Sequence, residues 1–135
     1  MKKHKILVYG SLRRGIKENE VRIFGYRMFD LGSFPGVKYT GEMNESIVVE
    51  KCEVTDAQLK AFDEFEGYDP DHPVSSFYLR RNFGISTTDY ELYVYNQDVT
   101  SKNRVVSGDW LKHTGESEGC NTHMWNRFDE EEVVQ

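Results

Sequence analysis

The chain has 135 residues, a length that fits a single domain with its own hydrophobic core and leads us to expect one functional site. Its 17 basic and 23 acidic residues give a net charge of −6, which disfavours binding to nucleic acid or to an anionic membrane surface. No stretch approaches the roughly 20 apolar residues of a membrane span, and the N-terminus does not resemble a signal peptide.

The first half of the chain predicts two strands. Lys5 to Tyr9 is rich in β-branched and aromatic residues and ends at a glycine, which predicts a short central strand. Residues 10–38 are rich in glycine, so we expect mostly loop there, with a short helix over Val21 to Phe24. The partial alternation of Ile47 to Val54 predicts the second strand.

A helix is predicted from Thr55 to Glu66. Thr55 is a good N-cap, Gln58 completes the spacing of a capping box, and Gly67 follows as a stop.

The rest of the chain predicts a loop, a hairpin and a tail. Two prolines place residues 68–76 in a surface loop, and residues 77–86 and 89–96 are predicted strands joined at Thr87-Thr88. Val105-Val106 adds a short strand. We expect a domain of residues 1–120 and a tail of residues 121–135, which holds a solvated acidic run at Asp129 to Glu132. Several strands around one capped helix predict an α+β fold with a curved sheet or small barrel.

The predicted helix places a carboxylate on its apolar side. At about 100° per residue, Leu59, Phe62 and Phe65 define an apolar face, and Glu66 falls inside it while Glu64 points to water. Burial raises the pKa of a carboxyl group, which suits a group that exchanges protons. The alternative is that the helix frays at Phe65 and leaves Glu66 exposed.

The step Gly10-Ser11 ends the first strand. Such a turn frees successive main-chain N–H groups, which can hold an anion. Neither G-x-x-x-x-G-K-[ST] nor G-x-G-x-x-G is present, so a small carboxylate is favoured over a phosphate. The alternative is an ordinary strand-ending turn with solvated arginines.

Five motifs follow one another within residues 5–112. They are Tyr9-Gly10-Ser11-Leu12-Arg13-Arg14-Gly15, Ser33-Phe34-Pro35-Gly36-Val37, Leu59 to Asp63 leading into Phe65-Glu66-Gly67, Tyr78-Leu79-Arg80, and Tyr93-Val94-Tyr95. In this order they resemble the γ-glutamylcyclotransferase-like family. The resemblance implies a small mixed fold on a partly closed β-barrel with flanking short helices. It also implies an enzyme without cofactors that releases 5-oxoproline and a free amine from a γ-glutamylamine or another small γ-glutamyl compound.

The resemblance further implies roles for particular residues. The loop Tyr9-Gly10-Ser11-Leu12 holds the substrate's α-carboxylate by main-chain N–H groups. The family's catalytic glutamate corresponds to Glu66, in agreement with the helical-face argument. Tyr95 is either a hydrogen-bonding wall of the cavity or a packed core tyrosine. The rival hypothesis is a non-catalytic relative that binds a small carboxylate or a protein partner.

Two features depart from the family's pattern. Val49-Glu50 stands where the family commonly has Gly-Glu, and the loss of that glycine is expected to narrow the cavity. The loop of residues 68–77 is longer than in most relatives and directly follows Glu66, so it bears on which leaving amine is accepted.

The chain has two cysteines, Cys52 and Cys120. So few cysteines predict no disulfide framework and fit a reducing cytoplasm. Cys120 and His123, even with His113 nearby, lack the four-ligand spacing of a zinc site, so no metal is expected. Cys52 lies in an alternating strand and is expected to be a small buried hydrophobe rather than a nucleophile.

Overall fold

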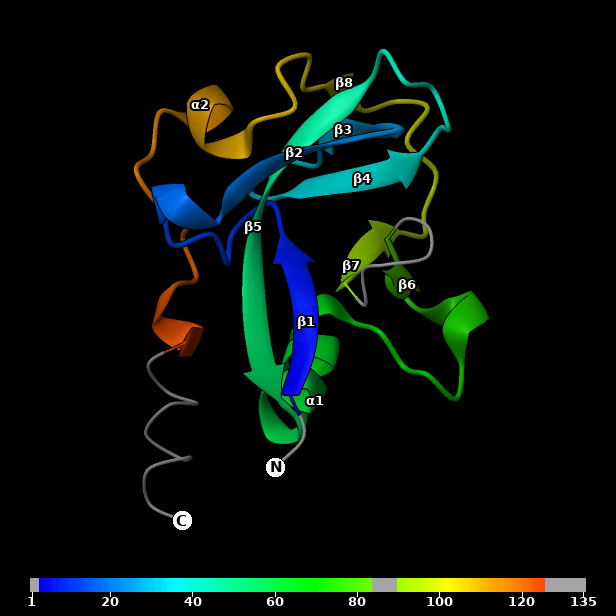
Figure 1. Ribbon diagram of the computed structural model, residues 1–135. Coiled ribbons are helices and arrows are strands. Elements are labelled where there is room, and N and C mark those ends of the chain that lie inside the picture. The colour runs from blue at the N-terminus through cyan, green and yellow to red at the C-terminus, as the bar shows by residue number, and fades with distance from the viewer. Residues whose placement is uncertain (1–2, 84–89, 126–135) are drawn as a thin grey trace.

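The computed structural model describes residues 3–83 and 90–125 and shows an α+β fold with two sheets and short helices (Figure 1). The strands are β1 (Lys3–Val8), β2 (Glu20–Phe24), β3 (Tyr26–Asp30), β4 (Pro35–Tyr39), β5 (Ser46–Thr55), β6 (Tyr78–Asn82), β7 (Tyr90–Tyr95) and β8 (Asn103–Arg104). The helices are α1 (Asp56–Glu66) and α2 (Trp110–Thr114), with 3₁₀ turns at Lys17–Asn19 and Pro73–Ser75.

The strands form two separate sheets within the described part of the chain. One has the order β2-β5-β1-β7-β6 and the other the order β4-β3-β8, which lies across the end at which β1 stops (Figure 1). The barrel is therefore not closed by hydrogen bonds. β4 nevertheless packs on β7, since a Cβ added to Gly36 would come within 2.9 Å of the Tyr95 side chain. The expected α+β class is confirmed.

The predicted helix is confirmed with both of its ends. The hydroxyl of Thr55 accepts from the Gln58 N–H at 3.2 Å, and the Gln58 side chain accepts from the Thr55 N–H at 2.9 Å, which completes the capping box. Gly67 ends the helix in the left-handed region, with φ 70°, where a residue without Cβ is favoured. Leu59 and Phe62 are buried against β1 and β5, as expected.

The prediction of a loop over residues 10–38 is wrong, because three strands lie there. The short helix expected over Val21 to Phe24 is strand β2, which pairs with β5 in the register Val21↔Val49 and Ile23↔Ile47. A run of four residues is too short to distinguish the 3.6-residue period of a helix from the two-residue period of a strand. The structure of this segment is decided by its pairing with β5, which lies more than 20 residues away in the sequence.

The C-terminal half agrees with the sequence in part. β6 and β7 pair antiparallel, as predicted, while their expected connection at Thr87-Thr88 lies outside the described residues. The strand expected at Val105-Val106 is wrong, because β8 ends at Arg104. Val105 is buried and donates its N–H to the Met28 carbonyl at 2.9 Å, while the Val106 side chain is exposed.

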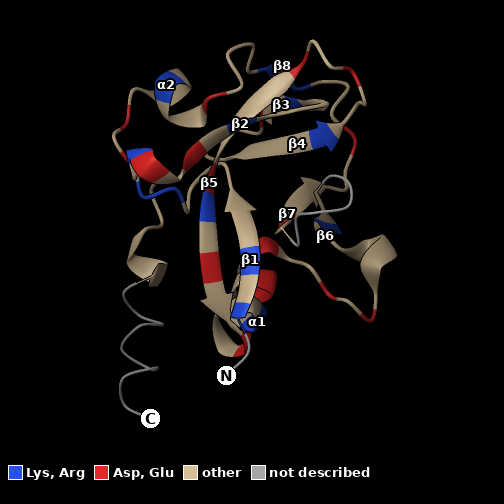
Figure 2. Cartoon of the chain, in the orientation of Figure 1, with Lys and Arg blue, Asp and Glu red and all other residues tan. Residues whose placement is uncertain are grey.

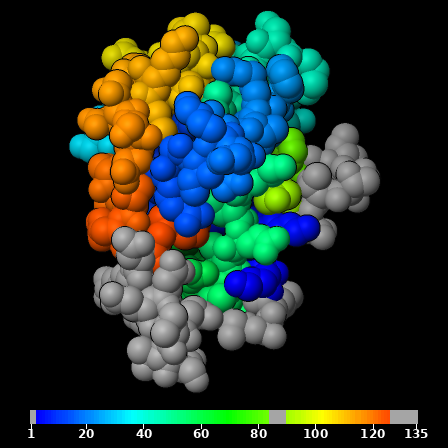
Figure 3. Space-filling model, turned by 60° about the vertical axis from the view of Figure 1, so that its left-hand side comes forward, coloured from blue at the N-terminus to red at the C-terminus, as the bar shows by residue number. Residues whose placement is uncertain are grey.

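Residues 119–125, which include the described part of the expected tail (residues 121–125), pack against the loop that follows β1 and against α1. Figure 3 shows this segment beside the N-terminal part of the chain. The Gly119 N–H donates to the Arg13 carbonyl at 2.7 Å, and the Asn121 N–H donates to the Ser11 carbonyl at 2.8 Å. The buried Trp125 side chain packs edge-on against Phe62, with ring centroids 4.8 Å apart. Residues 126–135, with the acidic run at Asp129 to Glu132, lie outside the described residues.

Basic and acidic residues alternate along the described chain without separating into two regions (Figure 2). None of its helices is both long and apolar enough to cross a membrane.

Candidate active site

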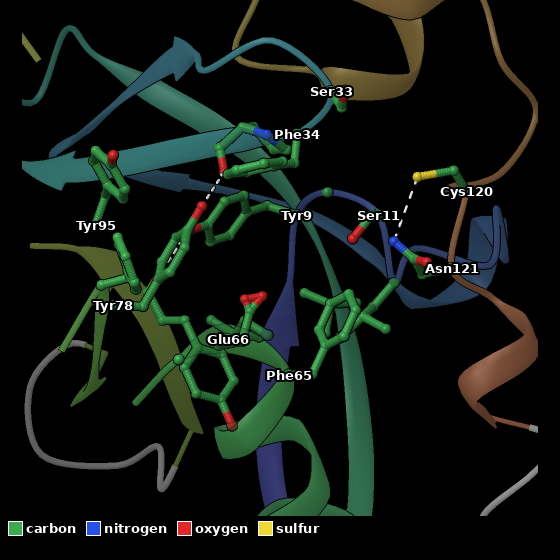
Figure 4. A pocket seen from close by; sticks show the side chains of 18 residues that line it. Tyr9, Ser11, Ser33, Phe34, Phe65, Glu66, Tyr78, Tyr95, Cys120 and Asn121 are labelled. Atoms are coloured by element: carbon green, nitrogen blue, oxygen red, sulfur yellow. Dashed lines mark hydrogen bonds between the residues drawn. The ribbon is translucent and has the colours of Figure 1, made fainter. Parts of the chain in front are cut away.

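The topology brings three chain segments together at the end of the five-stranded sheet where β1 and β7 stop. β1 and β7 are parallel, so their carboxyl ends lie side by side. β5 runs antiparallel to β1, and α1 turns back toward the carboxyl end of β1 (Figure 4). The described residues form a cavity of about 650 Å³ there (Figure 4).

All the residues for which the sequence predicts a role line this one cavity. They are Tyr9, Gly10, Ser11, Leu12, Glu66 and Tyr95. Sequence reasoning gave no role to several other lining residues, among them Ser33, Phe34, Phe77, Tyr78, Cys120 and Asn121. A signal was available for Ser33, Phe34 and Tyr78, because they belong to the ordered motifs. None was available for Asn121, which reaches the cavity through long-range packing.

Glu66 is the last residue of α1, and its carboxyl group points into the cavity (Figure 4). The helix is intact to this residue, so the alternative in which it frays at Phe65 does not hold. The side chain is only partly accessible, through the cavity, and no hydrogen bond to it is found among the described residues. Burial raises the pKa of Glu66 from 4.5 to about 8, because the charged form loses its water.

Phe65 does not take the core position that the helical face predicted. It is 40% exposed and lines the cavity, because the last turn of α1 borders the cavity rather than the sheet. Glu64 is exposed, as expected.

The loop Gly10-Ser11-Leu12 presents its main chain beside the cavity. Among the described residues, no hydrogen bond from the N–H groups of Ser11 and Leu12 is found. Their carbonyl groups, by contrast, accept from the Asn121 N–H and from Trp125 Nε1, both at 2.8 Å. The loop is thus held from its carbonyl side, which leaves N–H donors for an anion.

Gly10 has a packing reason to be a glycine. A Cβ at this position would come within 2.6 Å of the Pro35 ring, which also lines the cavity. The glycine therefore allows β4 to approach the end of β1.

A buried network of ion pairs and hydrogen bonds fixes the chain directly after the loop Gly10-Ser11-Leu12. The Arg13 guanidinium donates to Glu50, Asp109 and Glu20 at 2.9, 2.9 and 2.8 Å. Glu50 also accepts from the N–H groups of Arg14 and Gly15, at 2.9 and 3.0 Å. Arg13 and Glu50 are each only 1% exposed, so the alternative of a turn with solvated arginines does not hold for Arg13. Buried charges are tolerated when they are paired in this way.

The expected narrowing of the cavity by Val49 is not found. Val49 is fully buried in the hydrophobic core and does not line the cavity. Its neighbour Glu50 belongs to the network with Arg13.

A second polar cluster fixes the end of α1 against the sheet. Asp63 accepts from the Tyr93 hydroxyl at 2.6 Å and from the Arg80 guanidinium. These contacts tie the turn that precedes Glu66 to β6 and β7, so Glu66 has a defined position in the cavity. Burial, and then the hydrogen bond to Asp63, raise the pKa of Tyr93 far above its usual range.

Tyrosine side chains form the wall near Glu66 (Figure 4). The Tyr78 hydroxyl donates to the Pro35 carbonyl at 2.8 Å, and the Tyr9 hydroxyl donates to the Tyr93 carbonyl. Tyr95 packs edge-on against Tyr78, with centroids 5.1 Å apart. Burial, with a smaller contribution from Glu66, raises the pKa values of Tyr9 and Tyr78 well above 10, so both are neutral phenols at physiological pH.

The cysteine and histidine residues do not assemble a second site within residues 3–83 and 90–125. Both thiols are free, and no group of three or more His, Cys, Asp and Glu side chains there could hold a metal ion. His113 bonds to Asp30 at 2.9 Å. Cys52 is buried as expected, and burial raises the pKa of its thiol to about 11, so it is not a thiolate at neutral pH.

The fold and the cavity together define a small α+β protein in which the Glu66 carboxyl group and the loop Gly10-Ser11-Leu12 line the same cavity. The sequence profile of the family "Gamma-glutamyl cyclotransferase, AIG2-like" matches residues 6–112. The chain therefore belongs to this family. No curated protein matches it significantly.

Three solved structures resemble the chain. Uncharacterised protein PH0828 from Pyrococcus horikoshii is 21% identical, with a TM-score of 0.60 and coverage of 82% of this chain and 92% of that one. The protein ytfP from Escherichia coli is 24% identical, with a TM-score of 0.58 and coverage of 82% and 98%. The uropathogenic E. coli-specific protein c4763 is 15% identical, with a TM-score of 0.61 and coverage of 85% and 98%. At these identities the likeness shows the fold alone.

Proposed function

We propose that the protein is a γ-glutamyl cyclotransferase that converts a γ-glutamylamine, or another small γ-glutamyl compound, into 5-oxoproline and a free amine. The observation that carries this proposal is the position of Glu66, whose buried carboxyl group faces the same cavity as the loop Gly10-Ser11-Leu12. Family membership supports the same chemistry.

The nucleophile of this reaction is the substrate's own α-amine. It attacks the γ-carbonyl carbon, a C–N bond closes the five-membered lactam, and the bond to the leaving nitrogen breaks. The protein has to fold the γ-glutamyl chain into this geometry, and such positioning is worth several kcal/mol of the activation barrier. In the proposal, the N–H groups of Ser11 and Leu12 hold the α-carboxylate.

Glu66 moves the proton in two steps. The α-ammonium group must lose a proton before it attacks, and its positive charge stabilises the carboxylate form of Glu66 in the complex. The leaving nitrogen must gain a proton before it departs as an amine. After the ring closes, the former α-nitrogen must also lose a second proton to become the lactam N–H, and Glu66, again a carboxylate, accepts this proton and passes it to the released amine or to solvent. A carboxyl group with a pKa of about 8 accepts the first proton and donates it in the second step at little cost.

The test is release of 5-oxoproline from a panel of γ-glutamylamines, γ-glutamyl dipeptides and glutathione, followed by chromatography. We expect wild-type turnover on part of the panel and none for Glu66→Gln, which keeps the size of the side chain. Glu64→Gln, on the exposed side of the same turn, is the matched control and is expected to keep full activity. Full activity of Glu66→Gln would remove Glu66 from the mechanism.

A variant of the loop tests the anion site separately. Ser11→Pro deletes one main-chain N–H and is expected to raise KM. An unchanged KM in a folded variant would argue against the loop as the carboxylate site. If wild-type protein binds 5-oxoproline in a thermal-shift assay but turns over no substrate, the rival hypothesis of a non-catalytic carboxylate binder is favoured.

A further inference from the structure

We infer that the leaving group accepted by this cavity is an uncharged, apolar amine, above all one that carries an aromatic ring. This inference rests on the proposed function and names the class of substrate. It is carried by the charges, the exposed phenylalanines and the tyrosine wall of the same cavity.

The described residues that line the cavity offer no cation to a charged leaving group, and Lys38, with Nζ 5.8 Å from the centroid of the Tyr95 ring, is not one of them. Among the cavity's described lining residues, Glu66 is the only carboxyl group, and none is a lysine or an arginine. The proposed reaction places Glu66 beside the substrate's α-amine. A leaving amino acid or peptide would bring a carboxylate without a cation to pair with it, and burial of an unpaired charge is costly.

Three phenylalanines at the cavity remain partly exposed. Phe34, Phe65 and Phe77 come from separate segments and are 44%, 40% and 62% exposed, yet all three line the cavity. Apolar side chains that gather in this way around a concave site are typical of a surface that an apolar ligand covers. Of the long loop of residues 68–77, only its last residue, Phe77, lines the cavity.

The tyrosine wall is also suited to an apolar group. The hydroxyl protons of Tyr9 and Tyr78 are already donated to main-chain carbonyl groups, so the remaining surface that these side chains offer is largely ring. Aromatic groups pack on such rings edge to face, as Tyr78 and Tyr95 do with each other.

The volume leaves room for such a leaving group. The cavity of about 650 Å³ lies within the range of about 300–1,000 Å³ that drug-sized ligands occupy, and a γ-glutamyl group alone is much smaller than such a ligand.

The experiment compares γ-glutamyl-phenethylamide with γ-glutamyl-methylamide, γ-glutamyl-ε-lysine and γ-glutamyl-alanine by 5-oxoproline release. We expect the highest kcat/KM for the phenethylamide. Phe34→Ala and Phe77→Ala should raise KM for the phenethylamide roughly three- to tenfold but leave the methylamide within about twofold, because only the larger leaving group contacts the rings. Phe24→Ala is the matched control, since Phe24 is 51% exposed on β2, outside the cavity.

A second variant reverses the preference. Phe77→Arg supplies the missing cation and should raise kcat/KM for γ-glutamyl-alanine several-fold relative to the phenethylamide. Preference of the wild-type protein for the lysine or alanine compound would overturn the inference and leave the proposed function intact.

A binding experiment distinguishes a failure of the proposed function from a failure of this inference. N-phenethylglutaramic acid lacks the α-amine and cannot cyclise, so its affinity relative to the N-(5-aminopentyl) and N-carboxymethyl analogues reports the leaving-group site alone. If no compound releases 5-oxoproline, the proposed function fails. The phenethyl analogue must still bind most tightly in calorimetry, and equal or weaker binding overturns the inference.

Discussion

Glu66→Gln is expected to stabilise the protein at alkaline pH while it abolishes activity. The pKa of Glu66 rises from 4.5 to about 8 on folding, so the native state binds a proton more tightly than the unfolded chain does. The contribution of this group to stability is therefore fully present below about pH 4.5 and is lost as the pH rises through 8.

The magnitude follows from the size of that shift. About 3.5 pKa units correspond to an upper limit of about 5 kcal/mol, at roughly 1.4 kcal/mol per unit. Because the carboxyl group is partly accessible through the cavity, water recovers part of its hydration, and we expect a value somewhat below this limit, about 3–4 kcal/mol. The glutamine variant has no such cost of ionisation, so its advantage in stability over the wild-type protein should grow from less than about 1 kcal/mol at pH 5 to this value at pH 9.

The assay is urea unfolding of the wild-type protein, Glu66→Gln and Glu64→Gln at pH 5, 7 and 9. Other titrating groups are common to all three proteins and cancel in the differences. Glu64→Gln removes an exposed carboxylate from the same turn and should follow the wild-type protein at each pH. The reasoning is refuted if the difference between the wild-type protein and Glu66→Gln does not change with pH.

Three further results are expected. The kcat/KM of the wild-type protein should rise with pH and level off above about 8, because the free enzyme needs Glu66 as carboxylate, and a flat profile between pH 6 and 9 would contradict this role. Glu50→Gln should lower the free energy of unfolding by about 2–4 kcal/mol, because Glu50 pairs with the buried Arg13 and accepts from the main chain of the loop. It should also raise KM without moving the pH profile. Urea unfolding and steady-state kinetics measure the two effects, and an unchanged KM would show that the network does not position the substrate loop. Asp63→Ala should cost about 2–4 kcal/mol in urea unfolding and reduce kcat. The variant removes the carboxylate that binds both Arg80 and the Tyr93 hydroxyl, leaves Arg80 only the longer contact with Glu91 at 3.5 Å, and frees the last turn of α1. A loss below about 1 kcal/mol would count against this anchor.

The parts of the fold that local chemistry decides were predictable from the sequence. Thr55, Gln58 and Gly67 are within a few residues of the backbone groups that they satisfy or release, so both ends of α1 could be placed. β2 was missed because its structure depends on pairing with β5, more than 20 residues away. β3 and β4 form a local hairpin across residues 31–34, and they were missed because Pro35 and the glycines of this region were interpreted as loop signals.

The candidate site likewise has parts that local sequence patterns predict and parts that depend on distant contacts. The helical period placed Glu66 on the inner side of α1, and the Gly10-Ser11 step marked the loop at the end of β1. The groups that hold these two parts were not predictable, because Arg13 pairs with Asp109 and Asp63 with Tyr93 across long stretches of the chain. Periodicity also misplaced Phe65, since it does not show where the sheet beneath a helix ends.

The central claim is that the substrate's own amine closes the ring and that Glu66 transfers its proton. Mass spectrometry of the product formed from a γ-glutamylamine in H₂¹⁸O tests this directly. Wild-type protein should release 5-oxoproline without ¹⁸O, and Glu66→Gln should release none. Glutamate labelled with ¹⁸O, or equal amounts of 5-oxoproline from both proteins, would contradict the account.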